Sequence, residues 1–266
     1  MAQTQTLPAG AAGAEDHWIV VEPTPRWLRV MFGGETIADS KRAVLFRESG
    51  LLPIYYFPRE DVRTDLLMPS SYTSRDPYKG EAGHWTIKVA DAVAEHAAWS
   101  YVTPLPEWPD SPRYLAFYWN QMNAWYEEDD EVFVHPRDPY KRVDVMRSSR
   151  HVRVVVAGQT VAESRQARLL FETGLPTRYY IPREDVRLDL LEPSGTHTRC
   201  PYKGLASYWH VQIGDLRGKD LVWSYPEPIP ECPKIRELMC FFNERVEAIY
   251  VDGELMPKPR TKWSQD

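Results

Sequence analysis

The chain has 266 residues, enough for two domains of ordinary size, and 43% of them are hydrophobic, which excludes disorder over most of its length. Its formal charge of −6, from 32 Lys and Arg against 38 Asp and Glu, provides no positive field for a phosphate backbone, so we expect no nucleic-acid partner. Proline (23 residues) outnumbers glycine (14), a balance that favours extended segments and stiff corners over a helical bundle.

The N-terminal segment and the cysteines bear on the compartment. Met1–Ala14 contains neither Lys nor Arg, and residues 1–16 are interpreted as a disordered tail. No apolar run reaches the length of a signal peptide or a membrane span, so no membrane partner is expected. Cys200, Cys232 and Cys240 lack the spacing of a zinc knuckle or a disulfide framework. We therefore expect free thiols, no bound metal and a cytoplasmic location.

The sequence contains two copies of one unit, offset by 124 residues. This offset aligns Arg29-Val30 with Arg153-Val154 and needs no gap as far as Glu131 and Leu255. We predict two homologous domains in tandem, followed by a tail; the boundaries are 17–134 for the first domain, 135–140 for the linker, 141–257 for the second domain and 258–266 for the tail. The short, proline-rich linker favours a fixed pairing of the copies, an intramolecular pseudo-dimer, and is compatible with a homo-oligomer.

Hydrophobic residues in each copy alternate mostly with a period of two, which predicts an antiparallel sheet. Gly33-Gly34 marks the turn of an opening hairpin over residues 29–38, because a tight turn needs residues with positive φ. The further strands expected in the first copy are 43–46, 54–57, 85–89 and 97–101.

The last third of each copy is expected to contain a helix and a hairpin. Ser111-Pro112 and Cys232-Pro233 place a cap and a first-turn proline before residues 113–120 and 234–242, so one short amphipathic helix is predicted per copy. Val251-Asp252-Gly253-Glu254 then predicts a closing hairpin, and the repeat makes residues 125–133 strand as well.

Several motifs together resemble the domain-of-unknown-function family 427. They are Gly34–Ser40, Glu172–Val186, His197–Gly204, Trp223–Tyr225 and Val251–Glu254. The resemblance extends over both copies and implies a mostly β fold of the β-tent type, in which two antiparallel sheets meet around an open ligand cleft. It implies no particular reaction. The family has carried a nucleotidyltransferase-like label, but the chain contains neither a Gly-Ser motif with paired aspartates nor a Walker-type loop.

The loop that precedes Pro201-Tyr202-Lys203-Gly204 is the first candidate site. The family pattern has His and Cys here; the second copy keeps His197 and Cys200, whereas the first has Thr73 and Asp76. Nearby cations would lower the pKa of Cys200 and make it a nucleophile; the alternative is a small apolar residue packed before a turn.

Lys203 recurs as Lys79 in the other copy. It is therefore a candidate for anion binding or proton transfer, and the alternative is an ion pair with a local carboxylate.

A charged run shared by the copies is the second candidate. If it is extended, Arg183 and Asp185 lie on one face, where the arginine could hold an anionic group and the aspartate could act as a base. Arg59 is the equivalent arginine of the first copy. The alternative is a surface run in which neighbouring charges neutralise one another.

Aromatic residues provide a third set. Trp223 and Tyr225 share one face of a strand, and Tyr179-Tyr180 places one ring on each face of the sheet, one for the core and one, Tyr180, for the cleft. Core packing is the first interpretation for Trp209, because Val211 and Ile213 continue its face, whereas Tyr225 has a polar hydroxyl and is the better ligand contact.

These residues predict a cofactor-independent enzyme, of hydrolase or lyase type, that acts on a small anionic or carbonyl-containing molecule in an aromatic-lined cleft. The expected catalytic residues are Cys200, His197, Asp185 and Lys203. The expected substrate-binding residues are Arg183, Tyr180, Tyr202, Trp223, Tyr225, Arg59 and Lys79. A non-catalytic module that binds a small molecule needs the same residue types and stays as the alternative.

Overall fold

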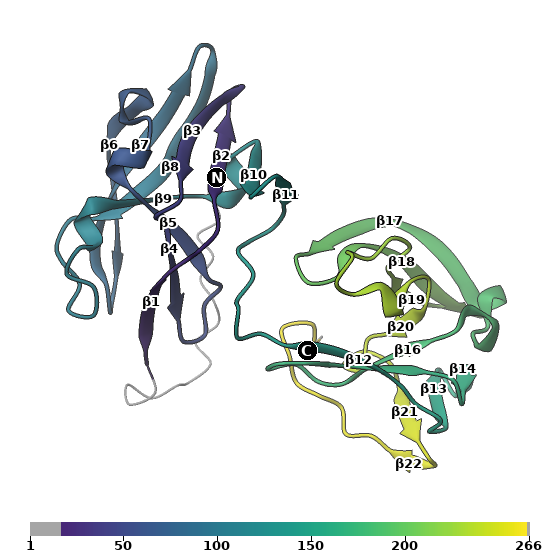
Figure 1. Ribbon diagram of the computed structural model, residues 1–266. Helices are drawn as coiled ribbons and strands as arrows, with labels where there is room; N and C mark the ends of the chain where they lie inside the picture. The colour runs from purple at the N-terminus through teal and green to yellow at the C-terminus, as the bar shows by residue number, and fades with distance from the viewer. Residues whose placement is uncertain (1–16, 265–266) are drawn as a thin grey trace. The chain divides into compact units, whose positions relative to one another are not determined.

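The computed structural model describes residues 17–264 as a mostly β protein (Figure 1). The predicted tail Met1–Ala14 lies outside the described residues. The chain divides into two compact units, unit 1 up to Asp138 and unit 2 from Pro139. This division falls inside the segment 135–140, and the two units repeat one topology.

Unit 1 contains a seven-stranded sheet and a four-stranded sheet, and every strand pair in both is antiparallel. The large sheet has the order β1-β4-β5-β9-β8-β7-β6. Its strands are β1 (Ile19–Pro23), β4 (Val44–Glu48), β5 (Ile54–Pro58), β6 (Leu67–Asp76), β7 (Gly80–Val89), β8 (Ala92–Tyr101) and β9 (Tyr114–Phe117). The small sheet has the order β11-β10-β2-β3, from β2 (Leu28–Phe32), β3 (Glu35–Ser40), β10 (Ala124–Glu127) and β11 (Asp130–Val132).

Unit 2 repeats both sheets strand for strand. Its large sheet has the order β12-β15-β16-β20-β19-β18-β17, and its small sheet the order β14-β13-β21-β22. The large-sheet strands are β12 (Val143–Arg147), β15 (Arg168–Glu172), β16 (Arg178–Ile181), β17 (Leu191–Cys200), β18 (Gly204–Ile213), β19 (Leu216–Ser224) and β20 (Met239–Phe241). The small-sheet strands are β13 (Val152–Val156), β14 (Gln159–Ser164), β21 (Ala248–Val251) and β22 (Glu254–Leu255).

Both faces of the large sheet of unit 1 are covered in its middle strands. Tyr55 belongs to the apolar cluster shared with the small sheet, whereas Tyr56 belongs to a second cluster that includes Leu105 and Trp108 from the loop after β8. Successive residues of a strand point to opposite faces, so these two tyrosines enter different cores. Neither ring is more than 2% exposed.

The opening hairpin is confirmed, and it explains its glycine pair. Gly33 and Gly34 both have positive φ, +59° and +86°. A Cβ on Gly33 would also lie 2.8 Å from the Cβ of Val89, so a side chain there would clash as well as strain the turn.

The predicted helices are wrong. Residues 111–121 form two 3₁₀ turns (Ser111–Arg113 and Trp119–Gln121) on either side of β9, and in unit 2 a turn at Pro233–Ile235 precedes β20. Because β9 lies between β5 and β8, its residues are buried on both faces, and such a continuous apolar run is hard to tell from a helix by periodicity. No helix within residues 17–264 is long and apolar enough to cross a bilayer.

Candidate functional site

The two Pro-Tyr-Lys-Gly turns each place a lysine against a buried carboxylate. Lys203 Nζ lies 2.5 Å from Glu172 Oε2, and Lys141 Nζ lies 3.2 Å from the other oxygen of that group. In unit 1, Lys79 Nζ lies 2.5 Å from Glu48 Oε2. Both turn lysines are buried and ion-paired, which favours the alternative of a structural pair over a free anion-binding ammonium.

The groups around this lysine–glutamate pair differ between the units. In unit 1, Asp76 Oδ2 lies 2.8 Å from Lys79 Nζ, and His17 Nε2 lies 2.8 Å from Glu48 Oε1. Burial alone would raise the pKa of Asp76, but its hydrogen bonds from Lys79 and from two backbone amides outweigh that effect and hold the pKa below its ordinary value. Cys200 occupies the place of Asp76 in unit 2, at the end of β17.

His197 and Cys200 point to opposite faces of β17, because they are three residues apart on a strand whose pairing with β18 is regular from His197 onward. His197 is exposed and its Nδ1 lies 3.4 Å from Ser207 Oγ, whereas Cys200 is half-buried. The strand therefore does not bring the imidazole and the thiol together. Burial raises the pKa of the other two thiols, to about 11 for Cys232 and about 12 for Cys240.

The charged run is not extended. Arg183–Asp185 forms a 3₁₀ turn, and Asp185 Oδ2 accepts a hydrogen bond of 2.5 Å from Ser164 Oγ. The guanidinium of Arg183 lies 5.8 Å above the ring of Trp209, and Arg59 lies 4.9 Å above Trp85 in unit 1. These contacts hold the turn against the neighbouring strands. Arg183 and Asp185 therefore contact Trp209 and Ser164, and neither contacts Cys200.

The predicted aromatic residues of unit 2 form a closed wall. Tyr180 is fully buried, Trp223 is 7% exposed and Tyr225 is 5% exposed. Trp223 Nε1 donates a hydrogen bond of 3.1 Å to Tyr180 Oη, and burial raises the pKa of Tyr180 and of Tyr225 well above the ordinary value. Tyr202 is half-buried below Lys141, whose Nζ lies 5.6 Å from its ring.

The equivalents of this wall in unit 1 are Tyr56, Trp99 and Tyr101, and both tyrosines are buried. A second aromatic surface of unit 1 contains Trp99 and is open; we call it the ring face. It consists of five rings from three adjacent strands and the residue after a fourth, namely Tyr72 (β6), His84 (β7), His96 and Trp99 (β8) and Tyr118 (after β9). Their centroids form a continuous row, with separations of 5.0 Å for His96–Tyr72, 4.7 Å for Tyr72–His84, 6.2 Å for His84–Tyr118 and 4.5 Å for Tyr118–Trp99. Tyr72 is 45% exposed and Tyr118 37% exposed.

Two serine–histidine contacts lie within the ring face. Ser74 Oγ is 2.9 Å from His84 Nε2, and Ser70 Oγ is 2.7 Å from His96 Nδ1. Burial lowers the pKa of His84, so its imidazole is neutral at pH 7. A neutral imidazole beside a hydroxyl can orient a ligand or accept a proton.

In unit 2 the side chain of Arg245 lies over the equivalent surface. Trp223 and Phe242 repeat the Trp99–Tyr118 contact, with the same 4.5 Å between centroids. Arg245 lies 5.2 Å above the ring of Phe242 and donates hydrogen bonds to the carbonyls of Lys219 and Asp220. The 124-residue offset places Gln121 at this position in unit 1.

The sequence predictions missed Tyr72, His84, His96 and Tyr118. A signal was present, since the offset replaces them by Thr196, Tyr208, Asp220 and Phe242 while it keeps the tryptophan between them. Within residues 17–264 no group of three His, Cys, Asp or Glu side chains is placed to hold a metal ion.

These observations define the chain as a tandem pair of two-sheet β domains. The model of the domain-of-unknown-function family DUF427 matches it twice, over residues 20–128 and 144–252, and the chain belongs to this family as a two-copy member. Both matches begin and end at positions related by the 124-residue offset. Among curated proteins, none is significantly similar to the chain.

Proposed function

We propose that the protein is a small-molecule-binding module and that the ring face of unit 1 is its binding surface. The observation that carries this proposal is the exposure of Tyr72 and Tyr118 within a continuous layer of five rings. Aromatic side chains supply a large contact area at a small loss of conformational entropy, and clustered exposed rings are typical of interaction sites.

The ligand class follows from the chemistry of the face. Two exposed tyrosine rings favour stacking against a flat or ring-shaped molecule. The hydroxyl of half-buried Ser74, held by the neutral imidazole of His84 beneath it, favours hydrogen bonds to hydroxyl or carbonyl groups at the edge of that molecule. We therefore expect a small ring compound with polar substituents.

A hydrolase is the second candidate, favoured by the contact of 2.9 Å between Ser74 Oγ and His84 Nε2. In this proposal Ser74 Oγ attacks a carbonyl carbon, and His84 takes the hydroxyl proton and passes it to the leaving group. Water then cleaves the acyl-serine with His84 as the base. Cys200 stays a predicted nucleophile of the same reaction class.

Saturation-transfer NMR with a panel of ring-bearing hydroxy and carbonyl compounds tests the binding proposal. Tyr72→Ala and Tyr118→Ala should each weaken binding by about ten-fold, because each removes one stacking surface. Tyr78→Ala is the matched control, since Tyr78 is 51% exposed in the same unit but stacks on His17. Equal affinity of all three variants would contradict the proposal.

Mass spectrometry of an ester panel in the same samples separates the two candidates. A hydrolase that uses the ring face should lose turnover in Ser74→Ala while it still binds the compound. Loss in Cys200→Ser instead would assign the nucleophile to unit 2. Absence of turnover in the unmodified protein would exclude the hydrolase for these esters and leave the binding module as the proposed function.

A further inference from the structure

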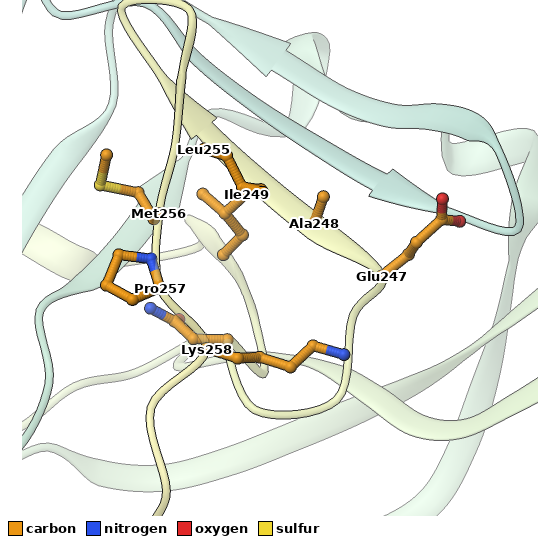
Figure 2. A pocket seen from close by; sticks show the side chains of 8 residues that line it. Glu247, Ala248, Ile249, Leu255, Met256, Pro257 and Lys258 are labelled. Atoms are coloured by element: carbon orange, nitrogen blue, oxygen red, sulfur yellow. The ribbon is translucent and has the colours of Figure 1, made fainter.

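Unit 2 contains a cavity of about 340 Å³ between the β21–β22 hairpin and the chain that follows it (Figure 2). Its apolar lining includes Ile249 from β21, Leu255 from β22, and Met256 and Pro257 from the following segment. Asn243 and Lys258 are also among the residues that line it. The cavity lies on the small sheet and is separate from the ring face, which belongs to unit 1.

The corresponding space in unit 1 is filled by two indoles. The offset places Trp119 and Trp125 at the positions of Asn243 and Ile249, and the strand register agrees, since Trp125 pairs with Val30 and Ile249 with Val154. The two indoles are stacked, with 4.2 Å between their centroids and 4° between their planes. Asparagine and isoleucine are smaller than the two tryptophans. Because the sheet holds the surrounding backbone in place, the smaller side chains leave a cavity.

One positive charge at this cavity is available to a ligand. Figure 2 shows the Lys258 side chain extending along the cavity, below Ala248 and Ile249. Lys258 is exposed and forms no ion pair with any of residues 17–264. Glu247, the acidic residue of the lining, keeps its charge, but its Oε2 accepts a hydrogen bond of 2.6 Å from the backbone N–H of Gly158, and Figure 2 shows its carboxylate pointing away from Lys258.

We propose that this cavity is a second binding site and that it takes a planar aromatic anion. The flat ring would occupy the space that stacked indoles fill in unit 1, against Ile249 and Met256. The carboxylate or sulfonate of the ligand would pair with Lys258 Nζ. Shape and charge thus point to the same class of molecule, and the site is independent of the ring face.

Naphthalene-2-carboxylate is a suitable probe, followed through the methyl NMR signals of Ile249, Leu255 and Met256 in the full chain. We expect saturable shifts of these methyl groups. The double variant Asn243→Trp with Ile249→Trp, which copies unit 1, should abolish them. Lys258→Gln should weaken binding by about five-fold, since an exposed ion pair contributes a modest amount. Naphthalene-2-methanol, the uncharged analogue, should bind more weakly by a similar factor.

Lys262→Gln is the matched control, because Lys262 is exposed and four residues away, and its Nζ lies 5.0 Å from the ring of Trp263. It should bind the probe with unchanged affinity, as should Tyr72→Ala on the ring face. The proposal is overturned by absence of methyl shifts at millimolar probe, or by unchanged affinity in Lys258→Gln. Unchanged affinity in a folded double-tryptophan variant would overturn it as well. Lys258→Gln lies on the surface, so this arm of the test does not depend on how the double variant folds.

Discussion

Units 1 and 2 have the same strands in the same order, yet they offer different surfaces. Unit 1 exposes its ring face and fills the space beside its β10–β11 hairpin with stacked indoles. In unit 2, Arg245 covers the surface equivalent to the ring face, and a cavity lies beside the β21–β22 hairpin. A few side chains on a common backbone therefore decide which part of a unit is accessible. The tandem arrangement gives one chain two different candidate sites.

The buried ion pairs mark a second difference. Both units keep the Lys–Glu pair at the Pro-Tyr-Lys-Gly turn. Only unit 2 has the bidentate pair of Arg178 and Glu244, with both contacts at 2.7 Å, and Thr261 donates a further hydrogen bond to Glu244. Residues 258–264 thus pack onto unit 2, where Trp263 also lies against the core. Unit 1 has Ile54 and Asn120 at the corresponding positions.

The largest expected effect comes from Glu244→Ala. The variant leaves the guanidinium of Arg178 buried without its carboxylate, and we expect a loss of about 3 to 5 kcal/mol in the stability of unit 2. Hydrogen exchange followed by mass spectrometry should show faster exchange in unit 2 only. The double variant Arg178→Ile with Glu244→Asn, which copies unit 1, should recover much of the loss. Slow exchange in both variants would contradict this account of the pair.

Lys79→Met should destabilise unit 1 by about 2 to 3 kcal/mol, because Glu48 and Asp76 lose the ammonium group between them. Lys203→Met should cost unit 2 less, since Lys141 still pairs with Glu172. Guanidinium unfolding of the full chain, followed by NMR signals from each unit, compares the two losses. A larger loss of stability in Lys203→Met than in Lys79→Met would show that Lys141 does not compensate for the missing lysine.

Arg245→Gln should open the closed face of unit 2, because glutamine stands at this position in unit 1. We expect a loss of about 1 kcal/mol from the hydrogen bonds to the carbonyls of Lys219 and Asp220. The rings of Trp223 and Phe242 should then become accessible to an added quencher or label. A face that stays protected in the variant would show that another contact covers these rings.

The smallest expected effect is a pH dependence confined to unit 1. The folded-state pKa of His84 is lowered from 6.5, so the unfolded chain binds the proton first as the pH falls. His84 therefore lowers the stability of unit 1 progressively below about pH 6.5. His84→Tyr, the residue found in unit 2, should remove this loss. Denaturant midpoints of unit 1 at pH 7.5 and 5.5 measure this loss of stability. An equal drop of the midpoint in the unmodified protein and in His84→Tyr would argue against a neutral buried His84.

The fold could be predicted where the signal is local. Gly33-Gly34 and Val251–Glu254 identify their hairpins because turn chemistry depends on adjacent residues, and both are confirmed. The helices were wrong because the place of β9 inside the sheet depends on strand order, and periodicity does not reveal strand order.

The candidate site was harder to predict, because it too depends on strand order. The ring face combines side chains from β6, β7 and β8 and the residue after β9, and their proximity requires the pairing of β8 with β9. The partner of Lys203 is likewise 31 residues away in the chain. Trp223 was predicted to line the cleft; the structure shows it buried, at 7% exposure, with Arg245 over the neighbouring ring of Phe242.

Hydroxyl-radical footprinting tests the central claim, that the two units are accessible in opposite places, without any ligand. Oxidation rates relative to the unfolded chain should be high for Tyr118 in unit 1 and low for Phe242, which stands at the equivalent position of unit 2. They should likewise be high for Met256 in unit 2 and low for Trp125, which lies at a neighbouring position in unit 1. Their exposure supports this order, since Tyr118 is 37% exposed, Phe242 8% and Trp125 4%. Protection of Tyr118 equal to that of Phe242, together with protection of Met256 equal to that of Trp125, would contradict the account.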